Sequence, residues 1–217
     1  MPLTEYDRHC ARVPDIDLPA GATGAFQKFT IVQKNAVAEL PYKIPSSVGV
    51  VLPLGISTAA AGLFQEGFLS LPFPSAEESP KPLDRTLLIW GGSSSVGSCV
   101  IQLAVASGAE VITTASEKNF EYCKKLGAKE VFDYHKEDVE DQIVKWLKGK
   151  TVAGAFHSVG TDKTIQRCAK ILDRSKGKAI VVTTRAVPDE GIPKSVRTKM
   201  GKSSSSHSHF LSFSMTG

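Results

Sequence analysis

Residues 86–97 read TLLIWGGSSSVG, and this stretch decides the fold. Its first part, Thr86–Trp90, is a short apolar run followed at once by glycines, which is typical of a strand buried on both faces. Apolar residues then recur at helical spacing, at Val96, Val100, Leu103 and Ala104. This spacing predicts a helix that begins in the serine run and ends before Gly108, the residue type expected just beyond a helix end.

The alternation of strand and helix patterns continues to about residue 185. The expected strands are Thr86–Trp90, Glu110–Ala115, Glu130–Asp133, Val152–Val159 and Lys178–Thr183. The expected helices lie between them, around residues 96–107, 118–126, 139–147 and 165–172. Right-handed crossovers place helices on both faces of parallel strands, so this order predicts an α/β protein with a doubly wound parallel sheet.

The segment between the first strand and its helix resembles the dinucleotide-binding pattern G-x-G-x-x-G of a Rossmann sheet. We expect Gly92 to permit the tight turn and Gly97 to let the helix pack closely, while Ser94 replaces the usual middle glycine. The start of the helix would then direct its free N–H groups at a pyrophosphate, and the serine hydroxyls would add donors. A plain strand–helix turn without a ligand is the alternative. The candidate cofactor-binding residues here are Gly92, Ser93, Ser94, Ser95, Val96 and Gly97.

The end of the second strand favours NADPH over NADH. An NAD site usually carries an acidic residue at the strand tip, but the tip here is Ala115 or Ser116, and Glu117 comes one residue late. Ser116, Lys118 and Asn119 offer a hydroxyl, a cation and an amide to a 2′-phosphate. Residues 116–119 are therefore candidate cofactor-binding residues, with a solvated helix start at Lys118 as the simpler alternative.

Three further candidates stand where later strands end. Tyr134 follows the third strand and could pack on the adenosine phosphate or ribose, although a half-buried surface tyrosine is an equal alternative. Val159 and Gly160 end the fourth strand, where their backbone groups could contact the nicotinamide ribose.

These residues resemble the medium-chain dehydrogenase/reductase superfamily, in particular its zinc-free branch and the fungal trans-enoyl reductases. The resemblance covers about Gly24 to Lys199. Its pieces are GAFQKFT at 24–30, LGISTAA at 54–60, GGSSSVG at 91–97, SEKN at 116–119, LGA at 126–128 and FDY at 132–134. It implies a Rossmann domain, a separate GroES-like barrel domain, an active site between them, and NADPH-dependent hydride transfer to an activated double bond.

The resemblance also bears on zinc and on the active site. Zinc-dependent members have a cysteine ligand directly before a Gly-x-Ser-Thr segment, and Leu54 takes that position here. Because leucine cannot bind zinc, we expect no metal. The pair His207 and His209 lies in a serine run and makes a poor metal site. By resemblance Thr58 would lie near the nicotinamide, although Ser57 or Thr58 could simply cap the following helix.

The predicted domain organisation departs from that superfamily. Residues 1–84 would form only a remnant of the barrel with a connecting helix, residues 85–200 the NADP-binding domain, and residues 201–217 a disordered serine-rich tail. Too few residues precede Gly24 for a barrel, and the chain leaves the superfamily pattern after Met200. We therefore expect a truncated or mis-spliced form whose exposed apolar strand edges favour association.

Composition narrows the partners and the compartment. The chain has 217 residues and a net charge of +4, and residues 163–202 carry 11 Lys and Arg against 3 Asp and Glu. No aromatic residues are interleaved with these charges, which favours a solvated lysine-rich face over nucleic-acid binding. The apolar runs are too short to span a bilayer, and the N-terminus lacks an apolar signal region. Four widely spaced cysteines suggest no disulfide framework, so we expect a cytoplasmic protein.

The function expected from the sequence is an NADPH-dependent reductase for a small-molecule or acyl-carrier-bound enoyl substrate, with a role in polyketide metabolism as one option. Hydride would pass to the β-carbon of an enone, enoyl thioester or quinone, and the α-carbon would take a proton from a group that we cannot name. The alternatives are a nucleotide-binding remnant without turnover and a quinone reductase on the same fold. The oligomeric state stays open, with a dimer as one option.

Overall fold

The computed structural model describes residues 9–11, 28, 37–74 and 80–201. Two compact units are present, one made of Met1–Leu54 with Ser203–Gly217 and the other of Gly55–Lys202. The boundary at Gly55 falls inside the helix Leu52–Phe64, whose later residues pack into the core of the sheet. The domain division that we expected after residue 84 stays a prediction. The predicted tail, with His207 and His209, lies outside the described residues apart from Gly201.

The first unit contains few regular elements within its described residues. Strand β1 (His9–Ala11) pairs antiparallel with β2 (Val37–Glu39), and the short helix α1 (Ser46–Gly49) follows. That this segment belongs to a GroES-like barrel stays a prediction. The segment GAFQKFT, one piece of the resemblance, falls outside the described residues except for Lys28.

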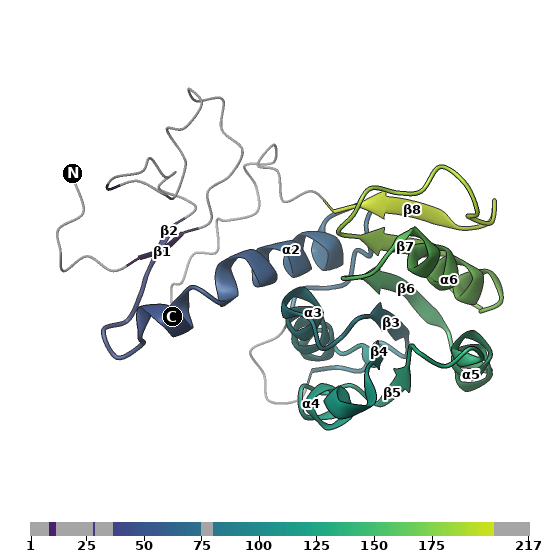
Figure 1. The fold of residues 1–217 in the computed structure, drawn as a ribbon, viewed down its shortest axis with the longest axis horizontal. Coiled ribbons are helices and arrows are strands. Elements are labelled where there is room, and N and C mark those ends of the chain that lie inside the picture. The colour runs from purple at the N-terminus through teal and green to yellow at the C-terminus, as the bar shows by residue number, and fades with distance from the viewer. Residues whose placement is uncertain (1–8, 12–27, 29–36, 75–79, 202–217) are drawn as a thin grey trace. The chain divides into compact units, whose positions relative to one another are not determined.

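The second unit is built on a six-stranded sheet in which all strands are parallel, as predicted (Figure 1). Its strands are β3 (Thr86–Trp90), β4 (Glu110–Ala115), β5 (Glu130–Asp133), β6 (Val152–His157), β7 (Ile180–Thr183) and β8 (Arg197–Met200). Their order is β5-β4-β3-β6-β7-β8, so the chain starts in the middle, builds one side outward and then crosses to the other. The reversal falls between β3 and β6, which is where doubly wound sheets bind ligands.

Helices cover both faces of this sheet (Figure 1). They are α2 (Leu52–Phe64), α3 (Ser95–Ala106), the 3₁₀ turn η2 (Glu117–Asn119), α4 (Phe120–Lys125), α5 (Val139–Leu147) and α6 (Asp162–Asp173). One apolar core joins α2, α3 and α4 to the face that carries Leu87 and Ile89, and a second joins α5 and α6 to the face that carries Leu88 and Trp90. The alternation along β3 therefore divides its side chains between two cores, as expected for a central strand.

The sequence pattern missed one strand. Residues Arg197–Met200 form β8 at the edge of the sheet, parallel to β7, although we expected no regular structure after residue 185. Side chains of β8 alternate between exposed and half-buried, and two of its four residues are cationic. An edge strand of this kind lacks the apolar run that reveals a central strand, and its charges hinder pairing with another sheet.

The helical segment Ser46–Phe64 is apolar enough and long enough to cross a membrane, judged by length and composition alone. This finding differs from our expectation that no apolar run reaches that length. Buried core helices pass the same test, and the second half of α2 packs into the core of the second unit. Ala59 and Leu63 are fully buried, and a Cβ on Gly62 would lie 2.4 Å from Cε2 of Phe156.

Lys178 links the connection between α2 and β3 to the sheet by hydrogen bonds. Its Nζ donates to the carbonyl oxygens of Phe68 (2.9 Å) and Leu69 (2.7 Å). Burial lowers the pKa of Lys178, and the nearby cations Arg197 and Arg85 lower it further. The charged amino group of Lys178 therefore satisfies two backbone carbonyls of a connection whose described residues pair with no strand.

Replacing Lys178 with methionine should lower the free energy of unfolding by about 1–3 kcal/mol, because two carbonyls lose a charged donor while the apolar stem is kept. The control is Lys176→Met, which changes an exposed lysine two residues away. Urea unfolding followed by circular dichroism measures both. Equal midpoints for the two variants would show that the Lys178 contacts contribute nothing to stability.

Candidate functional site

The turn after β3 lies at the carboxyl edge of the sheet and is built on three glycines. Gly91 has φ +85°, a left-handed conformation that favours glycine, so it makes the tight turn that we assigned to Gly92. Gly92 is needed for a different reason, since a Cβ there would lie 2.2 Å from Oγ1 of Thr113 on β4. A Cβ on Gly97 would lie 2.2 Å from the carbonyl oxygen of Gly91, which confirms the close packing expected of α3.

Ser94 acts inside the turn. Its hydroxyl caps α3 by accepting from the N–H of Gly97 (3.0 Å), and it lies 2.8 Å from the carbonyl oxygen of Gly91. Its hydroxyl is thus engaged within the turn, and a contact between Ser94 and a phosphate stays a prediction. Ser95 is exposed and Ser93 is half-buried, so these two hydroxyls stay accessible.

Two backbone donors are left at the start of α3. The Gly97 N–H is bonded to the Ser94 hydroxyl and the Ser98 N–H to the Ser94 carbonyl. The N–H groups of Ser95 and Val96 have no acceptor among the described residues. With the positive end of the helix dipole behind them, they form the arrangement that binds phosphate oxygens.

The end of β4 is tied to this turn. The side-chain amide of Asn119 donates to the hydroxyls of Ser116 (3.0 Å) and Ser93 (3.4 Å). Glu117 and Lys118 are exposed on the short 3₁₀ turn that precedes α4, where we expected a single helix. The structure therefore brings together the two segments that we singled out for the pyrophosphate and the 2′-phosphate.

The remaining candidates lie around the same edge. Val159 is 51% exposed and covers the turn, since a Cβ on Gly91 would lie 2.3 Å from its Cγ1. The carbonyl of Gly160 accepts from Nη1 of Arg185 at 2.9 Å. Tyr134 is exposed after β5, and its ring centroid lies 4.1 Å from that of His135.

Thr58 is not brought to the turn by any hydrogen bond between described residues. It is half-buried within α2, which begins at Leu52, so neither Ser57 nor Thr58 caps that helix as one alternative proposed. The same helix does pass beside the start of α3, because a Cβ on Gly55 would lie 3.1 Å from Oγ of Ser95. Placement of Thr58 near a nicotinamide stays a prediction.

Sequence reasoning also missed several polar residues at this edge. Ser158, Arg185 and Tyr122 all make hydrogen bonds around the turn or the loops beside it. Tyr122, for example, donates from its hydroxyl to Ser98 at 3.1 Å. Their contacts join residues far apart in the chain, and the only signal in the sequence was their position just beyond a strand or on a neighbouring helix.

His157, the last residue of β6, is fully buried beneath this edge. Its Nε2 lies 2.8 Å from the hydroxyl of Thr164 and its Nδ1 lies 3.2 Å from that of Thr183. The Thr164 hydroxyl donates to the carbonyl of Thr161, so we assign the ring proton to Nε2. Burial lowers the pKa of His157 to about 4, and the charge of Arg185 adds to this effect.

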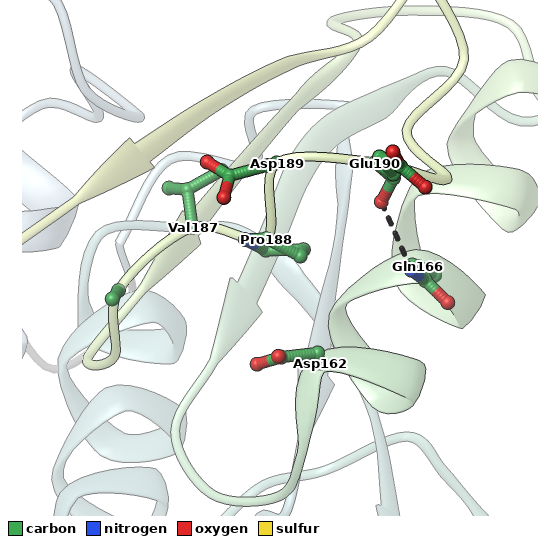
Figure 2. Close-up of a pocket in the computed structure, with 7 residues that line it drawn as sticks. Asp162, Gln166, Val187, Pro188, Asp189 and Glu190 are labelled. Carbon is green, nitrogen blue, oxygen red and sulfur yellow. Dashed lines mark hydrogen bonds between the residues drawn. The ribbon is translucent and has the colours of Figure 1, made fainter.

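A cavity of about 420 Å³ lies near this edge, between the start of α6 and the connection from β7 to β8 (Figure 2). Gln166 donates to the Glu190 carbonyl at 2.9 Å, and Figure 2 shows this bond on one side of the cavity that Asp162 and Asp189 also line. Three acidic residues and no cation line it. A dinucleotide phosphate would be repelled there, so the cavity is not the phosphate site.

No group of three His, Cys, Asp or Glu side chains could hold a metal ion within the described part of the chain. The residues present thus do not fit a zinc centre there, and we derive no step through one. Independence from zinc remains a prediction that rests on Leu54.

Acid should destabilise the fold through His157. The unfolded state, with a histidine pKa of 6.5, binds more protons than a folded state with a pKa of about 4, so stability should fall as the pH drops from 6.5 to 4. The loss should approach about 3 kcal/mol. Urea unfolding across this range measures it. His157→Asn should flatten the slope, whereas His135→Gln, on the surface, should keep it; an unchanged slope in His157→Asn would contradict the assignment.

Comparison with known proteins supports the arrangement. The family model described as zinc-binding dehydrogenase matches residues 95–214. The dehydrogenase pigH of Monascus ruber is 45% identical over 181 residues, which are 83% of this chain and 48% of that protein. The trans-enoyl reductase himH of Aspergillus japonicus is 43% identical over 173 residues, or 79% of this chain and 48% of that protein. This chain thus spans about half the length of these curated relatives.

Solved structures show the same fold. The CurK enoyl reductase superposes with a TM-score of 0.62 at 23% identity, covering 78% of this chain and 48% of that chain. The quinone oxidoreductase from Coxiella burnetii superposes with a TM-score of 0.55 at 28% identity, again over 78% and 48%. Sheet order, turn and sequence relatives agree, and the chain belongs to the zinc-binding dehydrogenase family of the medium-chain dehydrogenase/reductase superfamily.

Proposed function

We propose that this protein is an NADPH-dependent, zinc-independent reductase of activated carbon–carbon double bonds. The observation that carries the proposal is the pair of unpaired N–H groups at Ser95 and Val96, which face no competing acceptor in the described chain and lie at the strand reversal of a doubly wound sheet. Membership of an oxidoreductase family is established above. The cofactor choice, the substrate and turnover by a chain of this length are the proposal.

The bound cofactor would lie along the carboxyl edge of the sheet. Its pyrophosphate would accept hydrogen bonds from the start of α3, and its 2′-phosphate would meet Ser116, Lys118 and Asn119. The adenosine half would border Tyr134, and the nicotinamide ribose would contact the backbone at Val159 and Gly160.

The reduced nicotinamide supplies the hydride, and this chain's residues bind and orient it. An enone or an enoyl thioester on a carrier fits this chemistry, since hydride addition to the β-carbon gives an enolate whose oxygen hydrogen-bond donors stabilise. A quinone fits it as well, since hydride transfer gives a hydroquinone anion that the same donors stabilise. The name of the relative from Aspergillus japonicus, a trans-enoyl reductase, favours the enoyl substrate. The quinone oxidoreductase from Coxiella burnetii supports quinone reduction as the second candidate.

We also propose a cytoplasmic location. Cys99, Cys123 and Cys168 are free and buried, and burial raises the pKa of each thiol. Unreactive free thiols suit a reducing compartment.

Cofactor preference can be measured by titrating the protein with NADPH and NADH and following tryptophan fluorescence. Trp90 ends β3 directly before the glycine turn, so it should report binding there. We expect NADPH to bind about tenfold more tightly, and Lys118→Ala to remove most of that preference, because one charge–phosphate contact accounts for about 1.4 kcal/mol. Lys125→Ala, at the far end of α4, is the control. Equal affinities in the unchanged protein would contradict the choice of NADPH.

The reaction class can be tested by following NADPH oxidation at 340 nm with a set of enones, enoyl thioesters and quinones. We expect oxidation with an enoyl thioester or enone, at a rate that chelators do not change. Oxidation with quinones alone would select the second candidate. Tight NADPH binding without oxidation of any acceptor would show a nucleotide-binding module without turnover.

A further inference from the structure

Ser158 occupies a special place in the turn although it was not among the predicted site residues. It follows β6 directly and is only 8% exposed. Its hydroxyl lies 2.7 Å from the carbonyl oxygen of Trp90 and 2.9 Å from that of Gly91, both on the neighbouring strand end. Its N–H also donates to the Trp90 carbonyl at 3.1 Å.

The Ser94 hydroxyl completes this group. It lies 3.1 Å from the Ser158 hydroxyl and 2.8 Å from the Gly91 carbonyl. Each hydroxyl has one proton, so the two together can give the carbonyls of Trp90 and Gly91 one hydroxyl donor each. The Gly91 carbonyl also accepts from the N–H of Ser94 at 3.1 Å, so donors of Ser94 and Ser158 occupy both carbonyls.

The direction of the Gly91 carbonyl matters for a bound anion. Gly91 adopts a left-handed conformation with φ +85°, and it has no side chain to resist rotation of the adjoining peptide groups. Its oxygen also lies directly under α3, 2.2 Å from the position of a Cβ on Gly97. If this oxygen turned outward, its partial negative charge would face the phosphates beside the N–H groups of Ser95 and Val96.

The same residue links the turn to the other half of the crevice. The Ser158 carbonyl accepts from the hydroxyl of Thr184, just beyond β7, at 3.1 Å. The next residue, Val159, packs over Gly91. Ser158 thus joins the ends of β3, β6 and β7 across the strand reversal.

We propose that Ser158 is a positioning residue for the dinucleotide. Together with the hydroxyl and N–H of Ser94, it fixes the Gly91 carbonyl inward so that the start of α3 presents only donors to the pyrophosphate. The inference rests on the proposed binding of a nicotinamide dinucleotide. Because Ser158 acts at the pyrophosphate, its loss affects every ligand that contains this group, whether or not the ligand carries a nicotinamide or a 2′-phosphate.

The test measures the dissociation constants of NADPH, NADH and ADP-ribose for the full chain by calorimetry. Ser158→Ala should weaken all three by about five- to tenfold and leave the ratio between NADPH and NADH unchanged. Ser158→Thr, which keeps the hydroxyl, should recover most of the affinity. The matched control is Ser107→Ala, since Ser107 is also buried and donates to a carbonyl, that of Leu103, at 2.8 Å.

Melting temperatures of all variants separate positioning from stability. A general loss of stability would appear in both alanine variants, whereas the loss of affinity should appear only in Ser158→Ala. If Ser158→Ala does not fold, Thr184→Val, which removes the donor to the Ser158 carbonyl, should weaken the same three ligands in the same proportion.

Two outcomes count against the proposals in different ways. An unchanged protein that binds none of the three ligands would overturn both the proposed function and this inference. The role of Ser158 alone would be overturned if the unchanged protein binds the ligands and Ser158→Ala binds them as tightly as Ser107→Ala does. Where Thr184→Val is used instead, affinities equal to those of Ser107→Ala would overturn it in the same way.

Discussion

The contact on which the site depends is the approach of α3 to the end of β3, which the missing side chain of Gly97 allows. A Cβ at that position would lie 2.2 Å from the Gly91 carbonyl oxygen and 2.9 Å from the Gly92 Cα, and both are backbone atoms that cannot give way. The helix would have to move outward, and its first N–H groups would move with it. The proposed phosphate binding at this edge would thus depend on packing as much as on hydrogen bonding.

The order of the strands places this contact where a ligand can reach it. Strands β3 and β6 are neighbours, but the helices that follow them, α3 and α6, pack into different cores on opposite faces of the sheet. The loops that leave the two strands therefore diverge, which opens the crevice typical of such sheets. The contact between Ser158 and Ser94 bridges the two strand ends and so fixes the backbone from which the two loops diverge.

The sequence predicted those helices and strands whose apolar residues follow a regular pattern of burial. The bounds of β3, β4 and β5 agree with the expected ranges. These strands are largely buried, and the residues that flank them in the sequence interrupt the apolar pattern. The sequence did not predict β8, because a strand at the edge of the sheet does not need a run of apolar residues. At the turn it assigned the tight turn to Gly92, whereas Gly91 takes the positive φ, because a pattern of glycines does not say which one does so. The Ser94–Ser158 contact joins residues 64 positions apart, and no local pattern encodes it.

Selection of the 2′-phosphate rests on fewer constraints than binding of the pyrophosphate. Glu117 and Lys118 are adjacent and both exposed, so the attraction of one side chain for a phosphate is opposed by the other and screened by water. The amide of Asn119 is bonded to Ser116 and Ser93, and its donors are already in use. A 2′-phosphate must therefore compete with existing hydrogen bonds, whereas a pyrophosphate meets two N–H groups that have no other acceptor in the described chain. This difference argues that the proposed dinucleotide binding would depend chiefly on the start of α3, and that a preference between NADPH and NADH would be a smaller energetic contribution added to it.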